Sequence, residues 1–256
     1  MHVPGADSSA GRWVVRWRVA LVTLVIGVVI VALGTAAAAE VYDQITEEHN
    51  GVAAFDRPAL DWAVAHRPGW LTDTATAVTH TGGGIGLPIL GAIAGLAFWW
   101  FRRSWTPFLI IIATGTGSLV MTMVGKAVIV RARPPLAEAV PPYEHSPAFP
   151  SGHTLNSTAL ALVVGYLVLL GADRHRERVL TVVAAVAFPL VIGLTRVYLG
   201  HHWLTDVVAG WALGAAWAAI VITAHRLYLT VAHSRRGNGG TADPPAEPVP
   251  ERRTPP

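Results

Sequence analysis

The stretch FPSGHTLNSTALALVVGYLVLLGA, residues 149–172, joins a short polar turn to an apolar run of membrane-spanning length. The triplet PSG is typical of turns, whereas His153 is an unusual residue at the start of a membrane helix. The hydrocarbon core of a bilayer requires roughly 20 mostly apolar residues per helix. The sequence of residues 154–172 therefore predicts a transmembrane helix with a titratable imidazole, that of His153, at its N-terminal end.

The composition of the chain also indicates an integral membrane protein. Of its 256 residues, 52% are hydrophobic and only 14% are charged, whereas soluble domains have about 25% charged residues. The absence of cysteine excludes disulfides and cysteine-ligated zinc. Apart from Lys126, every basic residue other than histidine is an arginine, and these arginines sit beside apolar runs. This pattern favours a role in membrane topology over nucleic-acid binding.

Six apolar stretches are approximately long enough to cross a bilayer. They are residues 19–39, 82–101, 106–130, 154–172, 179–195 and 203–224. No internal repeat is visible. We therefore predict an all-α fold, that of a polytopic membrane protein with six transmembrane helices.

The distribution of basic residues between the loops predicts the orientation. Thirteen arginines fall on the side that carries both termini, at positions 12, 16, 18, 102, 103, 174, 176, 178, 226, 235, 236, 252 and 253. Six basic residues fall on the other side: Arg57, Arg67, Lys126, Arg131, Arg133 and Arg196. The positive-inside rule therefore predicts a multi-pass protein of the cell membrane with both termini in the cytoplasm.

The chain divides into a cytoplasmic N-terminal flank (1–18), a membrane-embedded domain (19–228) and a disordered cytoplasmic tail (229–256). The first apolar stretch could instead be a cleaved signal peptide. Its apolar core is longer than the roughly 7–15 residues of a signal sequence, so we expect it to be retained. Residues 40–81 form an outer segment, which is interpreted either as one or two helices on the outer leaflet or as a solvated connector.

Three polar clusters lie close to the ends of the predicted spans. They are KAVIVRARP (126–134), PSGH (150–153) and TRVYLGHHWLTD (195–206). Each has an ordinary explanation: basic residues that snorkel to the interface or anchor it, a histidine that caps a helix, and a structural ion pair. However, all three fall on the same side of the membrane under a topology assigned without them. Ionisable residues at membrane depth are functional candidates.

The charges in these clusters predict an anion site. Lys126, Arg133 and Arg196 are three cations without an equal number of neighbouring carboxylates, and arginine matches phosphate oxygens bidentately. Ser151 and Gly152 lie at a predicted helix N-terminus, where backbone N–H groups and the helix dipole favour an anion.

The histidines of the clusters supply the residues needed for phosphoryl transfer. His202 and Asp206 are one helical turn apart, so the carboxylate can fix the imidazole tautomer and leave the other ring nitrogen as a nucleophile. His153 can then protonate the leaving oxygen as a general acid. Nearby, His80 and His145 are weaker candidates for the outer mouth of the site. Glu138, Tyr143 and Glu144 are equally weak candidates for shaping access of a head group.

The order K-x6-R-P, then P-S-G-H, then R-x5-H-x3-D resembles the type 2 phosphatidic acid phosphatase (PAP2) superfamily. The resemblance covers roughly residues 56–228. Thr195 stands where the family often has serine, which keeps the hydroxyl. His201 is adjacent to the expected nucleophile, but the spacing to Arg196 and Asp206 selects His202.

The resemblance implies a PAP2-type helical core and metal-independent hydrolysis through a phosphohistidine intermediate, with no cofactor. It implies that His202 attacks phosphorus with the support of Asp206, while His153 acts first as an acid and then activates water. The implied phosphate-binding residues are Lys126, Arg133, Ser151, Gly152 and Arg196. Vanadium haloperoxidases share these motifs but are soluble proteins, so six spans argue against them.

An active site on the outer side predicts a lipid-borne phosphate as the substrate. We expect undecaprenyl diphosphate first, and phosphatidic acid or phosphatidylglycerol phosphate as alternatives. Membrane lipids are the other expected partners, and the oligomeric state cannot be read from the sequence. Two other classes remain open: a non-catalytic transporter or binding protein for anionic lipids, and a metal-dependent membrane hydrolase. The metal ligands of the latter would be His153, His201, His202 and Asp206.

Overall fold

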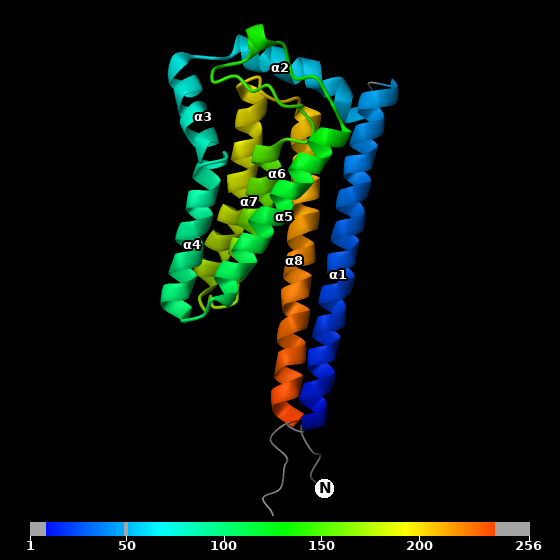
Figure 1. Cartoon of the computed structure of the whole chain (residues 1–256), viewed down its shortest axis with the longest axis vertical. Helices are drawn as coiled ribbons and strands as arrows, with labels where there is room; N and C mark the ends of the chain where they lie inside the picture. Colours follow the sequence, from blue (N-terminus) through cyan, green and yellow to red (C-terminus); the bar gives the residue numbers. More distant parts are fainter. Residues whose placement is uncertain (1–8, 49–50, 239–256) are drawn as a thin grey trace, which may run out of the picture.

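The computed structural model describes residues 9–48 and 51–238, which fold almost entirely as helices (Figure 1). The long elements are α1 (Ser9–Asp43), α2 (Asp56–Ala65), α3 (Gly69–Thr81), α4 (Gly86–Arg102), α5 (Thr106–Val128), α6 (Gly152–Leu169), α7 (His175–Tyr198) and α8 (Leu204–Asn238). Three single turns, η1 (Gln44–Glu48), η2 (Gly51–Phe55) and η3 (Leu136–Glu138), lie in the connections. The described ranges contain no strand, which confirms the all-α prediction.

Six membrane spans are present if the bent pair α3 and α4 is counted as one. Five helices, α1 and α5 to α8, are individually long and apolar enough to cross a bilayer. The other span is broken, because α3 and α4 meet at an angle of 52°. Residues 82–84 are three consecutive glycines, which are poor helix formers. The predicted second span, 82–101, therefore starts in the break, and its helix begins only at Gly86.

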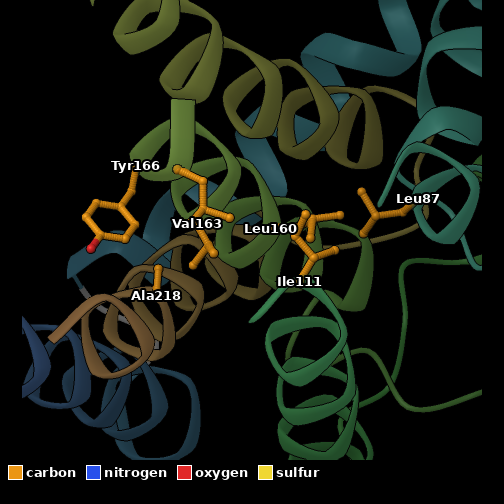
Figure 2. Packing of buried hydrophobic residues seen from close by; sticks show 7 residues of the cluster. Leu87, Ile111, Leu160, Val163, Tyr166 and Ala218 are labelled. Atoms are coloured by element: carbon orange, nitrogen blue, oxygen red, sulfur yellow. The ribbon is translucent and has the colours of Figure 1, made fainter. Parts of the chain in front are cut away.

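The centre of the bundle is α6, which packs against α4, α5, α7 and α8. Figure 2 shows its apolar contacts, with Leu160 next to Leu87 and Ile111, and Val163 and Tyr166 nearer to α8. Large apolar side chains on the outer faces of the other helices are exposed. A bundle of this kind needs a hydrocarbon surrounding for those faces.

Helices α6 and α8 approach closely because α8 carries Gly210 and Gly214 where they meet. A Cβ atom at Gly210 would lie 2.9 Å from the Cβ atom of Thr154, and one at Gly214 would lie 2.6 Å from the carbonyl oxygen of Leu155. Small residues four positions apart let membrane helices pack backbone against backbone. This contact fixes the start of α6, which contains PSGH, against the start of α8.

Helix α1 packs along α8, and the two helices extend together beyond the lower end of the others (Figure 1). A Cβ atom at Gly34 of α1 would lie 2.7 Å from the carbonyl oxygen of Ala212. The first apolar stretch is thus an integral part of the bundle.

The boundary predicted for the C-terminal tail was wrong. The sequence predicted disorder from residue 229, but α8 continues to Asn238. The remaining predicted tail, 239–256, and the first eight residues of the predicted N-terminal flank lie outside the described residues. The rest of that flank already belongs to α1, which begins at Ser9.

The outer segment, predicted at residues 40–81, contains the two helices α2 and α3. Helix α2 crosses the end of the bundle at which α6 and α8 begin (Figure 1), and its buried residues are Asp56, Leu60 and Ala63. Trp62 and Trp70 are exposed, as expected for interfacial aromatic residues. That these helices lie on the membrane surface stays a prediction.

Candidate active site

The three sequence clusters meet at one end of the bundle. A cavity of about 470 Å³ is lined there by Lys126, Gly152, His153 and His202. An adjoining cavity of about 510 Å³ is lined by Arg196 and again by His153. The remaining predicted residues, Arg133, Ser151 and Asp206, make hydrogen bonds around these cavities. The structure therefore brings together, at one place, residues that are up to 80 positions apart in the chain.

His202 lies in the turn between α7 and α8, and both of its ring nitrogens have partners. Its Nδ1 atom is 3.3 Å from Oδ2 of Asp206, and its Nε2 atom is 3.2 Å from Nη1 of Arg133. A carboxylate accepts and a guanidinium donates. These partners assign the proton to Nδ1 and leave the lone pair of Nε2 facing Arg133.

The charge state of His202 suits a nucleophile. Burial, together with the positive charges of Arg196 and Arg133, lowers the pKa of His202 well below its ordinary value of 6.5. The imidazole is therefore neutral near pH 7. A neutral ring with a fixed Nδ1 proton presents Nε2 for attack on an electrophile.

Arg133 and Arg196 converge on one carboxylate, that of Glu144. Arg133 Nη2 is 2.7 Å from Glu144 Oε2, and Arg196 Nη2 pairs with Glu144 Oε1. Burial alone would raise the pKa of Glu144, but the two guanidinium charges outweigh it and hold this pKa at about 2. The sequence placed Glu144 only tentatively near the head-group path, whereas the structure places it directly between the two arginines.

The pair of arginines retains donors for an oxyanion. Arg133 is held in place by Nη1 donating to the carbonyl oxygen of His201 at 2.6 Å and by Nε donating to that of Ser146 at 2.7 Å. Arg196 Nε is buried and has no hydrogen-bond partner among the described residues. Lys126, in the last turn of α5, donates from Nζ to the carbonyl oxygen of Pro147 and lines the cavity of about 470 Å³.

His153 lies between the two cavities and lines both. The glycines that break α3 from α4 leave room for its ring, because a Cβ atom at Gly83 would lie 3.1 Å from His153 Nε2. The imidazole therefore lies next to any group bound between Arg196 and Lys126.

Ser151 and Gly152 do not take equal parts in the site. The N–H of Ser151 donates to the carbonyl oxygen of Asp206 at 3.1 Å, and its Oγ accepts from Thr154 at 2.9 Å. The backbone amide of Ser151 is therefore engaged in joining α6 to α8. Gly152 lines the cavity of about 470 Å³, and a Cβ atom there would lie 2.9 Å from Cγ2 of Thr122.

The side chain of His201 points in a different direction from that of His202 and has a different hydrogen-bond partner. Its Nε2 atom lies 2.6 Å from the carbonyl oxygen of Val140, and burial with the charge of Arg196 lowers its pKa to about 4. The choice of His202 over His201 from spacing therefore agrees with the geometry around Asp206. In the part of the chain that the structure describes, no three histidine or carboxylate side chains are arranged to hold a metal ion.

The weaker candidates separate into two groups. His80 lines the cavity of about 510 Å³, whereas Glu138 pairs with Arg57 at 3.0 Å on the rim. His145 and Tyr143 are absent from the linings of both described cavities.

Sequence reasoning missed two residues that contact the site. Arg131 donates to Asp206 Oδ1 at 2.6 Å and to Asp56 Oδ2 at 2.7 Å. The available signal was the R-x-R spacing, which places a second arginine two positions before Arg133. Asp56 is 150 residues from Asp206 in the chain, and no local pattern connects them.

The chain is similar in sequence to known phosphatases. Residues 103–228 match the PAP2 superfamily. Phosphatidylglycerophosphatase B of Bacillus subtilis (strain 168) is 34% identical over 168 residues, which cover 64% of this chain and 80% of that protein. Decaprenylphosphoryl-5-phosphoribose phosphatase of Mycobacterium tuberculosis (strain CDC 1551 / Oshkosh) is 31% identical over 169 residues, which cover 64% of this chain and 85% of that protein.

The fold leads to the same family. The crystal structure of the transmembrane PAP2-type phosphatidylglycerolphosphate phosphatase from Bacillus subtilis aligns with a TM-score of 0.65 and 26% identity, over 82% of this chain and 96% of that one. Sequence, fold and the order of the motifs agree, and the chain belongs to the PAP2 superfamily as a membrane lipid phosphatase.

Proposed function

We propose that this protein hydrolyses the terminal phosphate of a membrane lipid on the extracytoplasmic side, without a metal ion, through a phosphohistidine intermediate. One observation carries the proposal. A single cavity is lined by the polar side chains Lys126, His153 and His202 and by apolar residues of α4 and α5, among them Leu87 and Leu119. One end suits a phosphate and the other suits a hydrocarbon chain.

The apolar part of the cavity reaches the outer surface of the bundle. Ile112 and Leu119 of α5 both line it, and they are 49% and 51% exposed. In a membrane these side chains contact lipid. A substrate with an acyl or prenyl tail can therefore place its phosphate beside His202 while the tail stays among apolar side chains.

The first chemical step follows from the geometry of His202. Its Nε2 lone pair attacks phosphorus, and the bond from phosphorus to the lipid oxygen breaks as the P–N bond forms. His153 donates a proton to the departing oxygen, which leaves as an alcohol or a lipid phosphate. The negative charge on the transferred phosphoryl group is stabilised by Lys126, Arg133 and Arg196, and such charge stabilisation dominates phosphoryl transfer.

The second step restores the enzyme. Water attacks the phosphohistidine, His153 takes a proton from that water, and the P–N bond breaks to release inorganic phosphate and neutral His202. Asp206 holds the Nδ1 proton of His202 during both steps. Because the leaving group and then the water occupy the same side of phosphorus, one residue at the position of His153 can serve both.

Two substrate classes fit, and they differ in the group that leaves. The relatives named above act on phosphatidylglycerophosphate and on a decaprenylphosphoryl phosphoribose, both of which carry a phosphate monoester. Their likeness favours a lipid phosphomonoester for this chain, ahead of the undecaprenyl diphosphate that the sequence alone ranked first. The diphosphate, whose outer phosphate has the same charge and geometry, is the second candidate.

The proposed sidedness rests on the distribution of arginines. The catalytic cluster lies at the end of the bundle opposite to the start of α1 and the end of α8 (Figure 1). The thirteen arginines of the more basic side belong to that opposite end or to its flanking segments. The positive-inside rule then supports a cytoplasmic position for that end.

The test is a phosphate-release assay on purified protein in excess EDTA. The panel contains phosphatidylglycerol phosphate, phosphatidic acid and undecaprenyl diphosphate. We expect release from at least one lipid, and we expect His202→Ala to lower kcat on the order of 10³-fold or more. His175→Ala, at the exposed first position of α7, is the matched control and should retain activity.

Three results would contradict the proposal. Full activity of His202→Ala would exclude the phosphohistidine mechanism. Loss of activity in EDTA that zinc restores would indicate a metal-dependent hydrolase instead. Stable binding of the lipids with no release over long incubation would favour a transporter or a binding protein.

A further inference from the structure

We propose that Arg131 and Asp56, which lie outside the three motifs, are positioning residues for the reaction: together they hold Asp206 as an anion in the orientation that directs the His202 nucleophile. This inference rests on the proposed function of His202. It gives the outer helix α2, which begins at Asp56, a role in supporting the active site.

Each oxygen of the Asp206 carboxylate has its own donors. Oδ2 lies 3.3 Å from Nδ1 of His202 and accepts from the N–H of Trp203 at 3.0 Å. Oδ1 accepts from Nη1 of Arg131 at 2.6 Å. The carboxylate is therefore fixed from both sides, and among the described residues Arg131 is the one charged donor to Oδ1.

Arg131 is in turn held by a second carboxylate. Its Nη2 atom donates to Oδ2 of Asp56 at 2.7 Å, and its Nη1 atom also donates to Oγ1 of Thr205 at 2.7 Å. The hydroxyl group of Thr205 donates a hydrogen bond to Asp56 Oδ2 at 2.7 Å. The guanidinium thus bridges two aspartates through two different nitrogens, which a lysine could not reproduce.

Asp56 also binds the start of α8. Its Oδ1 atom accepts from the backbone N–H of Thr205 at 2.9 Å, in the first turn of that helix. A carboxylate in this position satisfies a free helix N–H group and interacts favourably with the helix dipole. Asp56 therefore caps α8 from another helix and sets the backbone from which Asp206 projects.

The carboxylates in these contacts are buried, so the loss of a charged partner would change their protonation or orientation. Asp206 and Thr205 are fully buried, and Asp56 is nearly so. A buried carboxylate without a counter-charge becomes protonated or loses its orientation. Either change would remove the acceptor for the Nδ1 proton of His202, and the ring could then present the wrong nitrogen. The ring of Trp203 lies 5.7 Å from the Arg131 guanidinium carbon and limits its movement.

Arg131 is not placed to bind the phosphate. Arg133 Nη1 lies 3.2 Å from the attacking Nε2 atom of His202, whereas the guanidinium of Arg131 donates to Asp206 Oδ1, Asp56 Oδ2 and the Thr205 hydroxyl. A residue of this kind should affect the chemical step and leave anion affinity nearly unchanged. Arg133, two positions later, should affect both.

The experiment compares Arg131→Met, Arg131→Lys and Asp56→Asn in the full-length protein, with Arg57→Met as the matched control. Arg57 neighbours Asp56 on α2 and also forms ion pairs, but with Asp61 and Glu138 on the exposed rim. For each variant kcat is measured with the best lipid of the panel. The inhibition constant of inorganic phosphate serves as the measure of anion affinity.

Arg131→Met should lower kcat roughly 10- to 100-fold, the range typical for a group that orients a reacting residue. The inhibition constant of phosphate should stay within about threefold of wild type, since Lys126, Arg133 and Arg196 are intact. Arg131→Lys should recover part of the loss, because it restores the charge and one of the two bridges. Asp56→Asn should show a smaller loss in kcat, and Arg57→Met none.

Other outcomes would overturn the inference. One is an unchanged kcat in folded Arg131→Met, and another is an equal loss of kcat and phosphate affinity in that variant. A third is failure of all three variants to fold, which would mean that the Asp56–Arg131–Asp206 bridge serves stability alone. Inactive wild-type protein, or a fully active His202→Ala, would instead refute the proposed function. The two failures are thus distinguishable in one set of measurements.

Discussion

The carboxylate of Glu144 lies where the two arginines of the site would hold a phosphate. It pairs with Arg133 and Arg196 at once, and its low pKa keeps it charged over the whole physiological range. A phosphate bound by the same guanidinium groups must displace this carboxylate. The glutamate therefore competes with the substrate and lowers the net affinity for anions.

This competition predicts the effect of Glu144→Gln. Removing the negative charge should strengthen inhibition by inorganic phosphate by about three- to tenfold, which corresponds to the roughly 1 kcal/mol of a partly exposed ion pair. The measurement is competitive inhibition of lipid hydrolysis. Glu138→Gln, whose carboxylate pairs with Arg57 on the rim, is the control and should leave the inhibition constant unchanged. Weaker inhibition in Glu144→Gln would show that Glu144 arranges the arginines for binding.

Much of the site could be predicted from sequence, because its residues lie at fixed spacings near helix ends. His202 and Asp206 are one turn apart, and the structure places them in contact. Ser151 illustrates the limit of this reasoning. Its amide was expected to face an anion, yet it bonds to the carbonyl oxygen of Asp206, a contact that depends on how closely α6 and α8 pack.

The same helix contact determines how the elements hold the site together. At Gly210, added volume would meet Thr154 and the carbonyl oxygen of Ser151, which lies 3.1 Å from the position of a Cβ atom. Those neighbours belong to the backbone and first turn of α6. Because α6 is the most buried helix of the bundle, they have little freedom to move away.

Gly210→Ala should therefore destabilise the protein by about 1–3 kcal/mol, the usual cost of overpacking. Gly115→Ala is the matched control, since an added Cβ there meets nothing within 4 Å, and the better helix propensity of alanine should leave Tm equal or higher. Thermal unfolding of both variants in detergent measures the difference. Equal Tm values would mean that α6 and α8 are not in close contact at Gly210.

The broken span shows what hydropathy can and cannot predict about an element. Apolar content correctly placed a membrane segment near residues 82–101. The three glycines at 82–84 fall inside that predicted segment. Their conformational freedom instead ends α3 and starts α4 at a 52° bend, and this bend provides the space next to His153.

At the scale of the whole molecule, the candidate site and the helix ends of α1 and α8 lie at opposite ends of the bundle (Figure 1), and the proposed function puts these ends on opposite sides of the membrane. The absence of cysteine makes this topology directly testable. A single cysteine at Ala137, in the exposed η3 turn near the site, should react with a membrane-impermeant maleimide on intact cells. A single cysteine at Asp173, in the turn between α6 and α7, should react only after lysis, and the reverse pattern would invert the proposed orientation.

The number of candidate spans follows from local composition, since each span is a property of about 20 residues, and the proposed sidedness rests on a local signal of the same kind. Local composition does not determine which helices become neighbours. The pairing of α1 with α8 and the position of α2 across the catalytic end join residues that are far apart in the chain. For the same reason the sequence revealed His202 but left its support from Arg131 and Asp56 undetected.

The half-exposed cavity wall formed by Ile112 and Leu119 has a kinetic consequence. A lipid that approaches through this wall diffuses in the plane of the bilayer, so the enzyme searches a surface and not a volume. The concentration that governs its rate is then the mole fraction of substrate among the surrounding lipids. Diluting the substrate with inert lipid slows such an enzyme, whereas adding buffer to the same vesicles does not.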